Sequence, residues 1–290
     1  MGQEKNSNPE RKAQKNTQKH GPEDQDEEEK DSLRRFEFGV NLGAYFPNRY
    51  SAGFYNGSPG NVNNVNYLFS NIYWYRDIKL ALGSIDTVFV DGYPEGMRYN
   101  VAFSGGLFFR LNFSRKSSLF LQAGYAQLNT ADIVTLRVDP DPYSLKLPDI
   151  RQEPIIGKEG RLLIDLGYQQ TFPLKSRFNI FVQGGLTMCF TMVLKSVLVV
   201  EGTEYNLVNI YGNNGYVPNS NSQSFNINQN KFGFGGYLGV GAGIPLTEML
   251  AVEPGFFTHY YAVNLQGYPD FKPSFGLYLR ILLSFAKTAD

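Results

Sequence analysis

The chain has 290 residues, and its 27 basic and 27 acidic side chains give a formal net charge of zero. This balance provides no bulk attraction to nucleic acid or to anionic lipid. No stretch approaches 18 uncharged apolar residues, which argues against a transmembrane helix. The single cysteine, Cys189, excludes an internal disulfide and a cysteine-based zinc site.

The N-terminal segment, residues 1–34, contains almost no large apolar side chain. After Met1, Leu33 is the exception. Basic residues dominate its first part and acidic residues its second part. Such a segment cannot bury enough apolar surface to offset the entropy lost on ordering. We therefore predict a disordered, charged periplasmic tail, which serves either as a solvated spacer or as an arm that binds a partner.

From Phe36 onward, apolar and polar side chains alternate with a period of two, which is the period of a β-strand. The alternation is clearest over 273–285, where Leu282 is the one misfit. In one segment the alternation slips near Gln127, which predicts a β-bulge. The predicted strands cover about 36–46, 97–113, 119–131, 162–172, 178–194, 232–244, 250–256 and 273–285.

The apolar bands have the length that a membrane requires. Several of them span eleven residues, and a tilted transmembrane strand needs about 9–11. Phenylalanines recur at one end of these bands, which predicts an aromatic girdle at the periplasmic interface. Its predicted members are Phe36, Phe113, Phe172, Phe178 and Phe285.

Connections between the predicted strands alternate between short and long. Short ones fall at about 114–118, 173–177 and 246–249, and long ones at 47–96, 132–159, 196–230 and 264–272. Short periplasmic turns and long extracellular loops are usual in outer-membrane barrels, so both termini are expected to be periplasmic. Within the first long connection, Tyr67–Tyr75 and Ile78–Val90 could form a hairpin above the membrane or two further transmembrane strands.

The outward face is apolar and the inward face polar, which is the arrangement of a barrel in lipid. We therefore predict an all-β fold for residues 35–290. It is a closed antiparallel up-and-down transmembrane barrel of eight strands, with ten as the alternative, and it carries long extracellular loops. The expected location is the outer membrane.

The predicted inward face carries charged and amide side chains, among them Arg98 and Gln122. An eight-stranded barrel is only just wide enough for side chains to fill it, and an unpaired buried charge is costly. We therefore expect a structural network that plugs the lumen, whereas a narrow ion path would need more strands. The predicted network consists of Glu37, Arg110, Asp165, Gln183, Glu253 and Arg280.

Sequence patterns for catalysis and for cofactors are weak. The two histidines are His20, in the tail, and His259, which has no serine at short spacing. The glycines of 239–243 resemble a phosphate-binding loop, but no helix follows them. Acidic residues between 139 and 149 match no calcium loop. We predict a protein that is not an enzyme, with no catalytic residue, cofactor or metal.

With the strands, the girdle and Phe285 in place, residues 36–285 resemble small outer-membrane barrels of the OmpA/OmpX type. The Tyr- and Asn-rich loops look most like the "outer membrane beta-barrel" proteins of Bacteroidota, which include the PorT-like barrels associated with type IX secretion. This resemblance implies a fold and a location but no activity. The departures are the absence of an apolar signal segment after Met1, the charged tail and the five residues after Phe285.

The leading functional hypothesis is a non-enzymatic anchor, scaffold or accessory subunit of a larger envelope complex for secretion or outer-membrane protein assembly. It would contact outer-membrane lipid, and protein partners through loops 47–96 and 196–230 and the tail, 1–34. No nucleic-acid partner is expected. The alternative is a narrow pore or small-ligand carrier. A soluble, calycin-like binding barrel is a third class, but it would need its apolar face inward.

Overall fold

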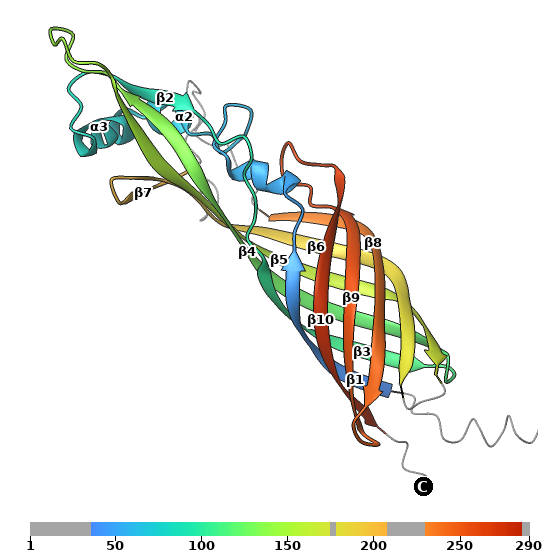
Figure 1. Cartoon of the computed structure of the whole chain (residues 1–290). Coiled ribbons are helices and arrows are strands. Elements are labelled where there is room, and N and C mark those ends of the chain that lie inside the picture. Colours follow the sequence, from blue (N-terminus) through green and yellow to red (C-terminus); the bar gives the residue numbers. More distant parts are fainter. Residues whose placement is uncertain (1–35, 175–177, 208–229, 286–290) are drawn as a thin grey trace, which may run out of the picture. The chain divides into compact units, whose positions relative to one another are not determined.

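The computed structural model describes residues 36–174, 178–207 and 230–285, and Figure 1 shows their arrangement. The predicted tail, 1–34, and residues 208–229 of the predicted loop 196–230 lie outside the described residues. No helix in the described ranges is long and apolar enough to cross a membrane. The strands are β1 (Phe36–Phe46), β2 (Val88–Gly92), β3 (Ala102–Asn112), β4 (Ser117–Val138), β5 (Asp149–Pro173), β6 (Asn179–Val200), β7 (Thr203–Asn206), β8 (Asn230–Pro245), β9 (Leu250–Ala262) and β10 (Phe271–Phe285). The helices are η1 (Tyr50–Tyr55), α2 (Asn66–Ser70) and α3 (Ile72–Ala81).

Eight of these strands close into a ring. Its order is β1, β3, β4, β5, β6, β8, β9 and β10, and every neighbouring pair is antiparallel. The ring is completed between β10 and β1, from Phe36 opposite Phe285 to Phe46 opposite Phe275. β2 and β7 pair only with the outer parts of β4 and β6. The prediction of an eight-stranded barrel is thereby confirmed against the ten-stranded alternative.

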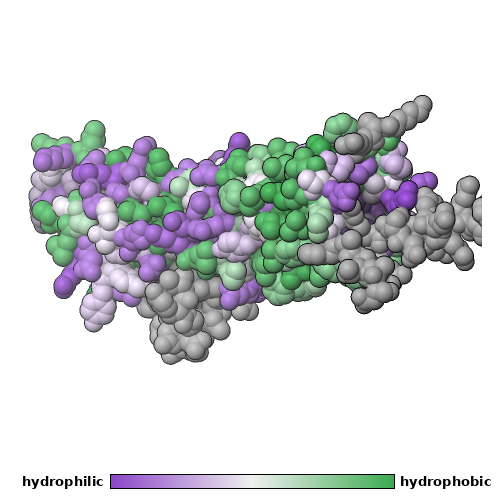
Figure 2. Space-filling view, turned by 90° about the horizontal axis from the view of Figure 1, so that it is seen from below, coloured by the Kyte–Doolittle hydropathy of each residue, from purple (hydrophilic) through white to green (hydrophobic). Residues whose placement is uncertain are grey.

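Large apolar side chains cover the outer surface of the ring. Val182, Leu186 and Leu279 expose 45%, 71% and 49% of their surface to the surroundings of the barrel. On the face that Figure 2 shows, hydrophobic residues form a band around the barrel, with hydrophilic residues on either side of it. Eleven residues of strand span about 33 Å, and a tilt of about 40° reduces this to about 25 Å, the height of the apolar band of a transmembrane barrel. We call this surface the belt.

Aromatic side chains mark the end of the barrel with the short turns. Phe36, Phe113, Phe172 and Phe178 are all about half exposed there. Phe285 pairs through its backbone with Phe36, and its side chain is outside the described atoms. Exposed phenylalanine side chains therefore occupy four of the five predicted girdle positions.

A second set of exposed aromatics borders the belt at the opposite end, which we call the mouth. Phe190 and Phe232 lie with ring centroids 5.0 Å apart, and Phe271 lies 5.7 Å from Phe234 and 5.8 Å from Tyr260. Aromatic girdles at both interfaces are typical of barrels in lipid. The sequence reading did not single out this second girdle.

Three strands continue far beyond the mouth, as Figure 1 shows for β4, β5 and β6. Along β4, Gln127 and Asn129 face outward where the belt has leucines, and Leu128 is buried on the inner side. The pairing with β5 runs without a shift from Ser117 to Val138. The predicted bulge near Gln127 is therefore wrong. The facing of the side chains is constant, and the polarity of the two faces reverses because the strand leaves the belt.

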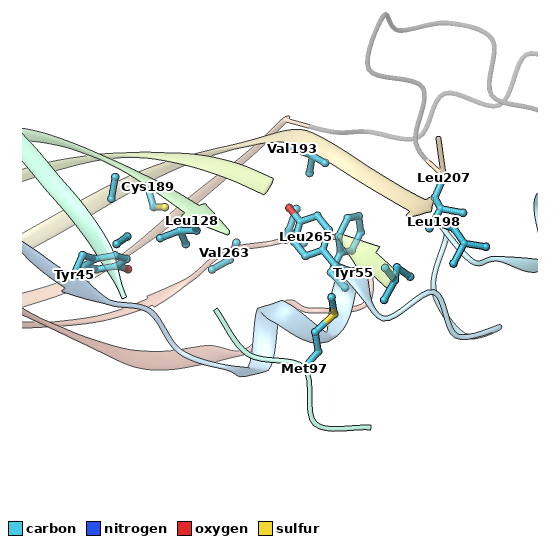
Figure 3. Packing of buried hydrophobic residues seen from close by; sticks show 14 of the residues in the cluster. Tyr45, Tyr55, Met97, Leu128, Cys189, Val193, Leu198, Leu207, Val263 and Leu265 are labelled. Carbon is cyan, nitrogen blue, oxygen red and sulfur yellow. The ribbon is translucent and has the colours of Figure 1, made fainter. Parts of the chain in front are cut away.

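The outer parts of β4, β5 and β6 (residues 127–138, 149–160 and 193–200) form, with β2, β7, η1, α2 and α3, a cored module that we call the platform. Most of the predicted loop 132–159 is thus strand. Its buried side chains include Val65, Leu68, Ile78 and Val134. Figure 3 shows that this core is continuous with the barrel interior, from Tyr45 and Cys189 to Tyr55 and Leu198.

Helices replace the hairpin or extra strands predicted within 47–96. The Asn71 side chain accepts hydrogen bonds from the backbone N–H groups of Tyr73 and Trp74, which caps α3. Ile78 and Leu82, four residues apart, are then buried on one side of that helix. The sequence reading gave weight to alternation here and overlooked both the cap and this spacing.

The ladder between β5 and β6 does contain a bulge, in β6. The register between β5 and β6 shifts between Lys158 and Glu159, opposite Lys195 and Val193, and leaves Leu194 without a partner in the ladder. The buried face therefore passes from the odd-numbered Val193 to even-numbered residues such as Leu198. The bulge turns the apolar end of β6 toward the platform core.

Close backbone approaches inside the barrel explain two glycines. A Cβ at Gly241 would lie within van der Waals overlap of the Phe181 ring, and one at Gly276 would overlap the Phe257 ring. Glycine at these positions gives buried aromatics their room. The predicted packing role of the β8 glycines, rather than phosphate binding, agrees with this geometry.

The belt boundary can be tested within one strand. Leu121→Arg places a charge on the outer face of β4 within the belt, where arginine costs about 2–4 kcal/mol in a transmembrane barrel. Gln127→Arg makes the same change three outward positions along, beyond the belt, where about 0–1 kcal/mol is expected. The unfolding free energy in lipid vesicles should fall only for Leu121→Arg. Equal losses would place Gln127 inside the belt.

Candidate functional site

A carboxylate between two guanidinium groups lies at the centre of the barrel interior. Glu253 on β9 accepts hydrogen bonds from Arg110 Nη1 at 2.9 Å and from Arg280 Nη1 at 3.0 Å. Arg110 also forms an ion pair with Glu37 on β1. Arg280 is fully buried and lies over the Phe108 ring, 3.4 Å from its centroid. These four charged groups neutralise one another where water has little access.

Amide side chains extend this arrangement around the lumen. Gln169 accepts from Arg110 Nη1 at 3.1 Å and from Gln183 at 2.8 Å. Gln122 accepts from Arg280 Nη2 at 3.2 Å and donates to Asp165 at 2.7 Å. Each amide thus links two parts of the network and leaves few polar atoms without a partner.

The structure brings all six predicted lumen side chains into one connected set, which we call the inner network. Each lies on the inner face of its strand. The network consists of Glu37, Asn41, Arg110, Gln122, Asp165, Gln169, Gln183, Glu253 and Arg280. Arg98 was also expected inside, but it is exposed, because β3 begins only at Ala102. Met97, the first residue of the strand predicted over 97–113, also lies outside β3 and is buried in the core that the platform shares with the barrel.

His259 joins the inner network through Asp165. Its Nε2 atom lies 3.0 and 3.1 Å from the two carboxylate oxygens, and Thr187 donates to the same carboxylate. His259 is 2% exposed. A histidine oriented by a carboxylate is one part of a hydrolytic triad, but no described serine hydrogen-bonds to this ring. The pair therefore contributes to the packing of the lumen.

A second buried ion pair closes the mouth. Arg161 and Glu159 on β5 are fully buried, with Arg161 Nε 2.6 Å from Glu159 Oε1. Arg161 Nη1 donates to Tyr261 at 2.8 Å, and Nη2 donates to Ser51 of η1 at 2.8 Å. We call these residues, with Tyr45, Tyr55 and Tyr99, the mouth cluster.

Two tyrosines complete the coordination of Glu159. Tyr55 and Tyr99 donate to Glu159 Oε2 at 2.7 and 2.9 Å. Burial, and after it the negative charge of Glu159, raises the pKa of Tyr55 and of Tyr99 well above its usual range. Both hydroxyls therefore keep the proton that they donate. Since Tyr55 and Ser51 belong to η1, the cluster fastens the first long connection onto the barrel.

The mouth cluster was missed by the sequence reading, although part of it was accessible. Arg161 and Glu159 continue the inward, odd-numbered face of Asp165 toward the N-terminus of the same strand. The strand was predicted to begin at residue 162, which left Glu159 at the end of the predicted loop 132–159 and Arg161 outside the predicted strand. Ser51 and Tyr55 lie in an irregular segment, where no periodicity indicates what they contact.

The chemistry of the interior is that of a plug. The inner network and the mouth cluster both cross the lumen and pair their charges internally. The described residues contain no group of three or more His, Cys, Asp or Glu side chains that could hold a metal ion. Cys189 is buried beside Thr191 at 3.5 Å.

Comparisons with known proteins give the following. No family model matches the chain, and no curated protein matches it. The neisserial surface protein A structure is similar over 88% of this chain and 99% of its own, with 9% identity and a TM-score of 0.39. The structure of the outer membrane protein OprG from Pseudomonas aeruginosa is similar over 88% of this chain and 98% of its own, with 13% identity and a TM-score of 0.39. The structure of Ail from Yersinia pestis, in complex with the heparin analogue sucrose octasulfate, is similar over 87% of this chain and 99% of its own. The identity is 10% and the TM-score is 0.35. These values say nothing about what this chain binds.

Glu253→Gln should destabilise the barrel, because it removes the carboxylate that two buried arginines share. Breaking a buried ion pair costs about 3–5 kcal/mol. A double-mutant cycle with Arg280→Gln should show a coupling of about 0.5–3 kcal/mol, measured by urea unfolding in detergent micelles. The exposed Glu248→Gln, in a short turn, is the matched control and should have no effect. Strict additivity between positions 253 and 280 would contradict the network.

Glu159→Gln should loosen the mouth without unfolding the belt. The substitution leaves Arg161 as a buried charge without its carboxylate. Amide hydrogen exchange in η1 should accelerate at least tenfold, whereas exchange in β9 and β10 should stay the same. Lys158→Gln, one residue earlier and facing outward, is the control. Unchanged exchange in η1 would mean that the mouth cluster does not hold this segment.

Proposed function

We propose that the chain is an integral outer-membrane protein that acts as a non-enzymatic anchor and presents its platform to a protein partner outside the cell. The structure of the platform is the main support for this proposal. Its strands have a polar outer face and an apolar core, so it is built to stand in water as a folded module. A barrel that served only as a pore would have no need for such a module.

The location follows from the physics of the belt. Within lipid, every backbone N–H and C=O group must be paired internally, and a closed barrel does this. The apolar belt between two aromatic girdles supports insertion in an outer membrane, with the short turns and both chain ends on the periplasmic side. The platform then lies on the extracellular side. The finer grouping with PorT-like barrels of Bacteroidota stays a prediction based on loop composition.

Exposed apolar side chains on the platform support a protein partner. Ile72, Tyr73 and Leu80 of α3 and the nearby Ile85 expose 76%, 75%, 68% and 78% of their surface. At the tip of the β4–β5 hairpin, Leu145 is fully exposed. Exposed apolar groups outside the belt are characteristic of surfaces that bind other proteins. The predicted partner loop 47–96 contains the first of these groups.

The interior argues against the pore alternative. Two layers of paired charges cross an eight-stranded lumen that side chains are able to fill. A carrier would need a route past both layers. Loop 196–230 and the tail stay predicted as further partner sites, because most of their residues lie outside the described residues. Assignment to a secretion or assembly complex also stays a prediction.

Affinity purification of the full chain from native outer membranes tests the anchor. The double variant Ile72→Ser/Leu80→Ser should lose the partner while retaining a heat-resistant folded band on gels. Leu246→Ser, which changes an exposed leucine at the short-turn end, should retain it. The purified protein should show no steady single-channel conductance in a planar bilayer. A partner that the α3 double variant retains would contradict α3 as the contact surface. Recovery of no partner, or steady conductance, would favour the pore or carrier.

A further inference from the structure

A cavity of about 50 Å³ lies in the wall of the barrel, and its lining combines inward-facing residues with Leu42 and Tyr125, which are partly exposed on the belt. Its lining includes Tyr45 from the mouth cluster and Gln122 and Asp165 from the inner network. Gly106 and Gly124, on neighbouring strands and opposite each other in register, also line it. The two glycines leave the wall without side chains at this level.

One lining residue, His259, has a ring nitrogen without a hydrogen-bond partner among the described residues. The ring lines the cavity and is 2% exposed, and its Nδ1 atom has no hydrogen-bond partner among the described residues. The opposite nitrogen, Nε2, faces both oxygens of Asp165. A carboxylate only accepts, so Nε2 carries the proton in the neutral ring, and Nδ1 is then a pure acceptor. The cavity therefore requires a guest that donates.

A second lining residue, Tyr278, also has a polar atom without a partner among the described residues. The Tyr278 hydroxyl is buried and likewise has no partner among the described residues. The Arg280 guanidinium lies over the Tyr278 ring, 4.7 Å from its centroid. A tyrosine hydroxyl both donates and accepts. Most of the remaining lining is apolar, including Leu163, Ala126 and the Phe257 ring.

We infer that this cavity is a binding site for small hydroxyl compounds, filled either by water or by a two-carbon alcohol whose hydroxyl donates to His259 Nδ1. Buried polar groups in proteins are nearly always hydrogen-bonded, and a site with polar groups and sufficient room holds solvent. A water needs about 10–15 Å³ of such volume, so the cavity has room for about three to five waters. Ethers and ketones lack the proton that Nδ1 requires. The site is independent of the proposed platform partner.

Crystals of the full chain in detergent provide the test, in three arms: no additive, ethanol and xenon. Oxygen density within about 3.2 Å of His259 Nδ1 in the first arm supports the site. In the second arm, ethanol in place of that density identifies an alcohol site, and unchanged density identifies water as the guest. Xenon occupancy without any oxygen at Nδ1, or no density at all, overturns the proposal, because a dry apolar cavity takes xenon.

Two matched glycine variants localise the guest. A Cβ at Gly124 would meet only the Gly105 carbonyl oxygen, at 4.0 Å, so Gly124→Ala adds a methyl group to the cavity without strain. At Gly236, on the outer face of β8 and outside this lining, a Cβ would meet only the Gly185 carbonyl oxygen, at 3.9 Å. Gly124→Ala should displace at least one ordered guest oxygen, and Gly236→Ala none. Equal occupancy in both variants overturns the assignment to this cavity.

Nitrogen NMR of the full chain in micelles gives an independent readout that needs no crystal. The His259 Nδ1 resonance should have the chemical shift of an unprotonated nitrogen that accepts a hydrogen bond. Tyr278→Phe should leave this resonance unchanged if the guest bonds Nδ1 directly. A shift typical of a free, unbonded nitrogen overturns the proposal.

Discussion

The pairing of β10 with β1 is the constraint on which the rest of the molecule depends. It joins the two ends of the sheet from Phe36 opposite Phe285 to Phe46 opposite Phe275. Once the ring is closed, no ring strand has an unpaired edge within the belt, and every backbone polar group there has a partner. Closure at eight strands also fixes a lumen that only side chains can fill. The outer face is therefore free to be apolar, and the inner face must pair its charges.

The barrel interior and the platform both bury side chains away from water, but the interior buries paired charges and the platform buries apolar side chains. Inside the barrel, Glu253 pairs with the buried guanidinium groups of Arg110 and Arg280, and at the mouth Glu159 pairs with that of Arg161, so both layers have their charges paired. Beyond the belt, the same three strands bury leucine and valine inward and turn glutamine and asparagine outward. A stiff barrel and a water-facing module are thus continuous through β4, β5 and β6. That continuity is what makes an anchor the function that the geometry supports best.

The barrel could be predicted from the sequence because its period-two alternation is strong and its girdle is aromatic. The bounds of Phe36–Phe46 and the eight-stranded ring came from this pattern alone. Gln127 was misread because alternation reports which face is apolar, and that assignment reverses where lipid ends. Arg161 was lost at a misplaced strand boundary. The cap at Asn71 and the bulge at Leu194 depend on local hydrogen bonding and on the partner strand, which periodicity does not reveal.

The platform rests on strands that run unbroken through the belt, and this determines how the protein would respond to force. A pull on the platform along β5 is directed along the strand axis. The ladder between β4 and β5 extends from Ser117 opposite Gln170 to Val138 opposite Asp149. Its hydrogen bonds lie across that axis, so they would be strained together in shear rather than opened one after another. Traction from outside would be distributed over the whole wall of the barrel.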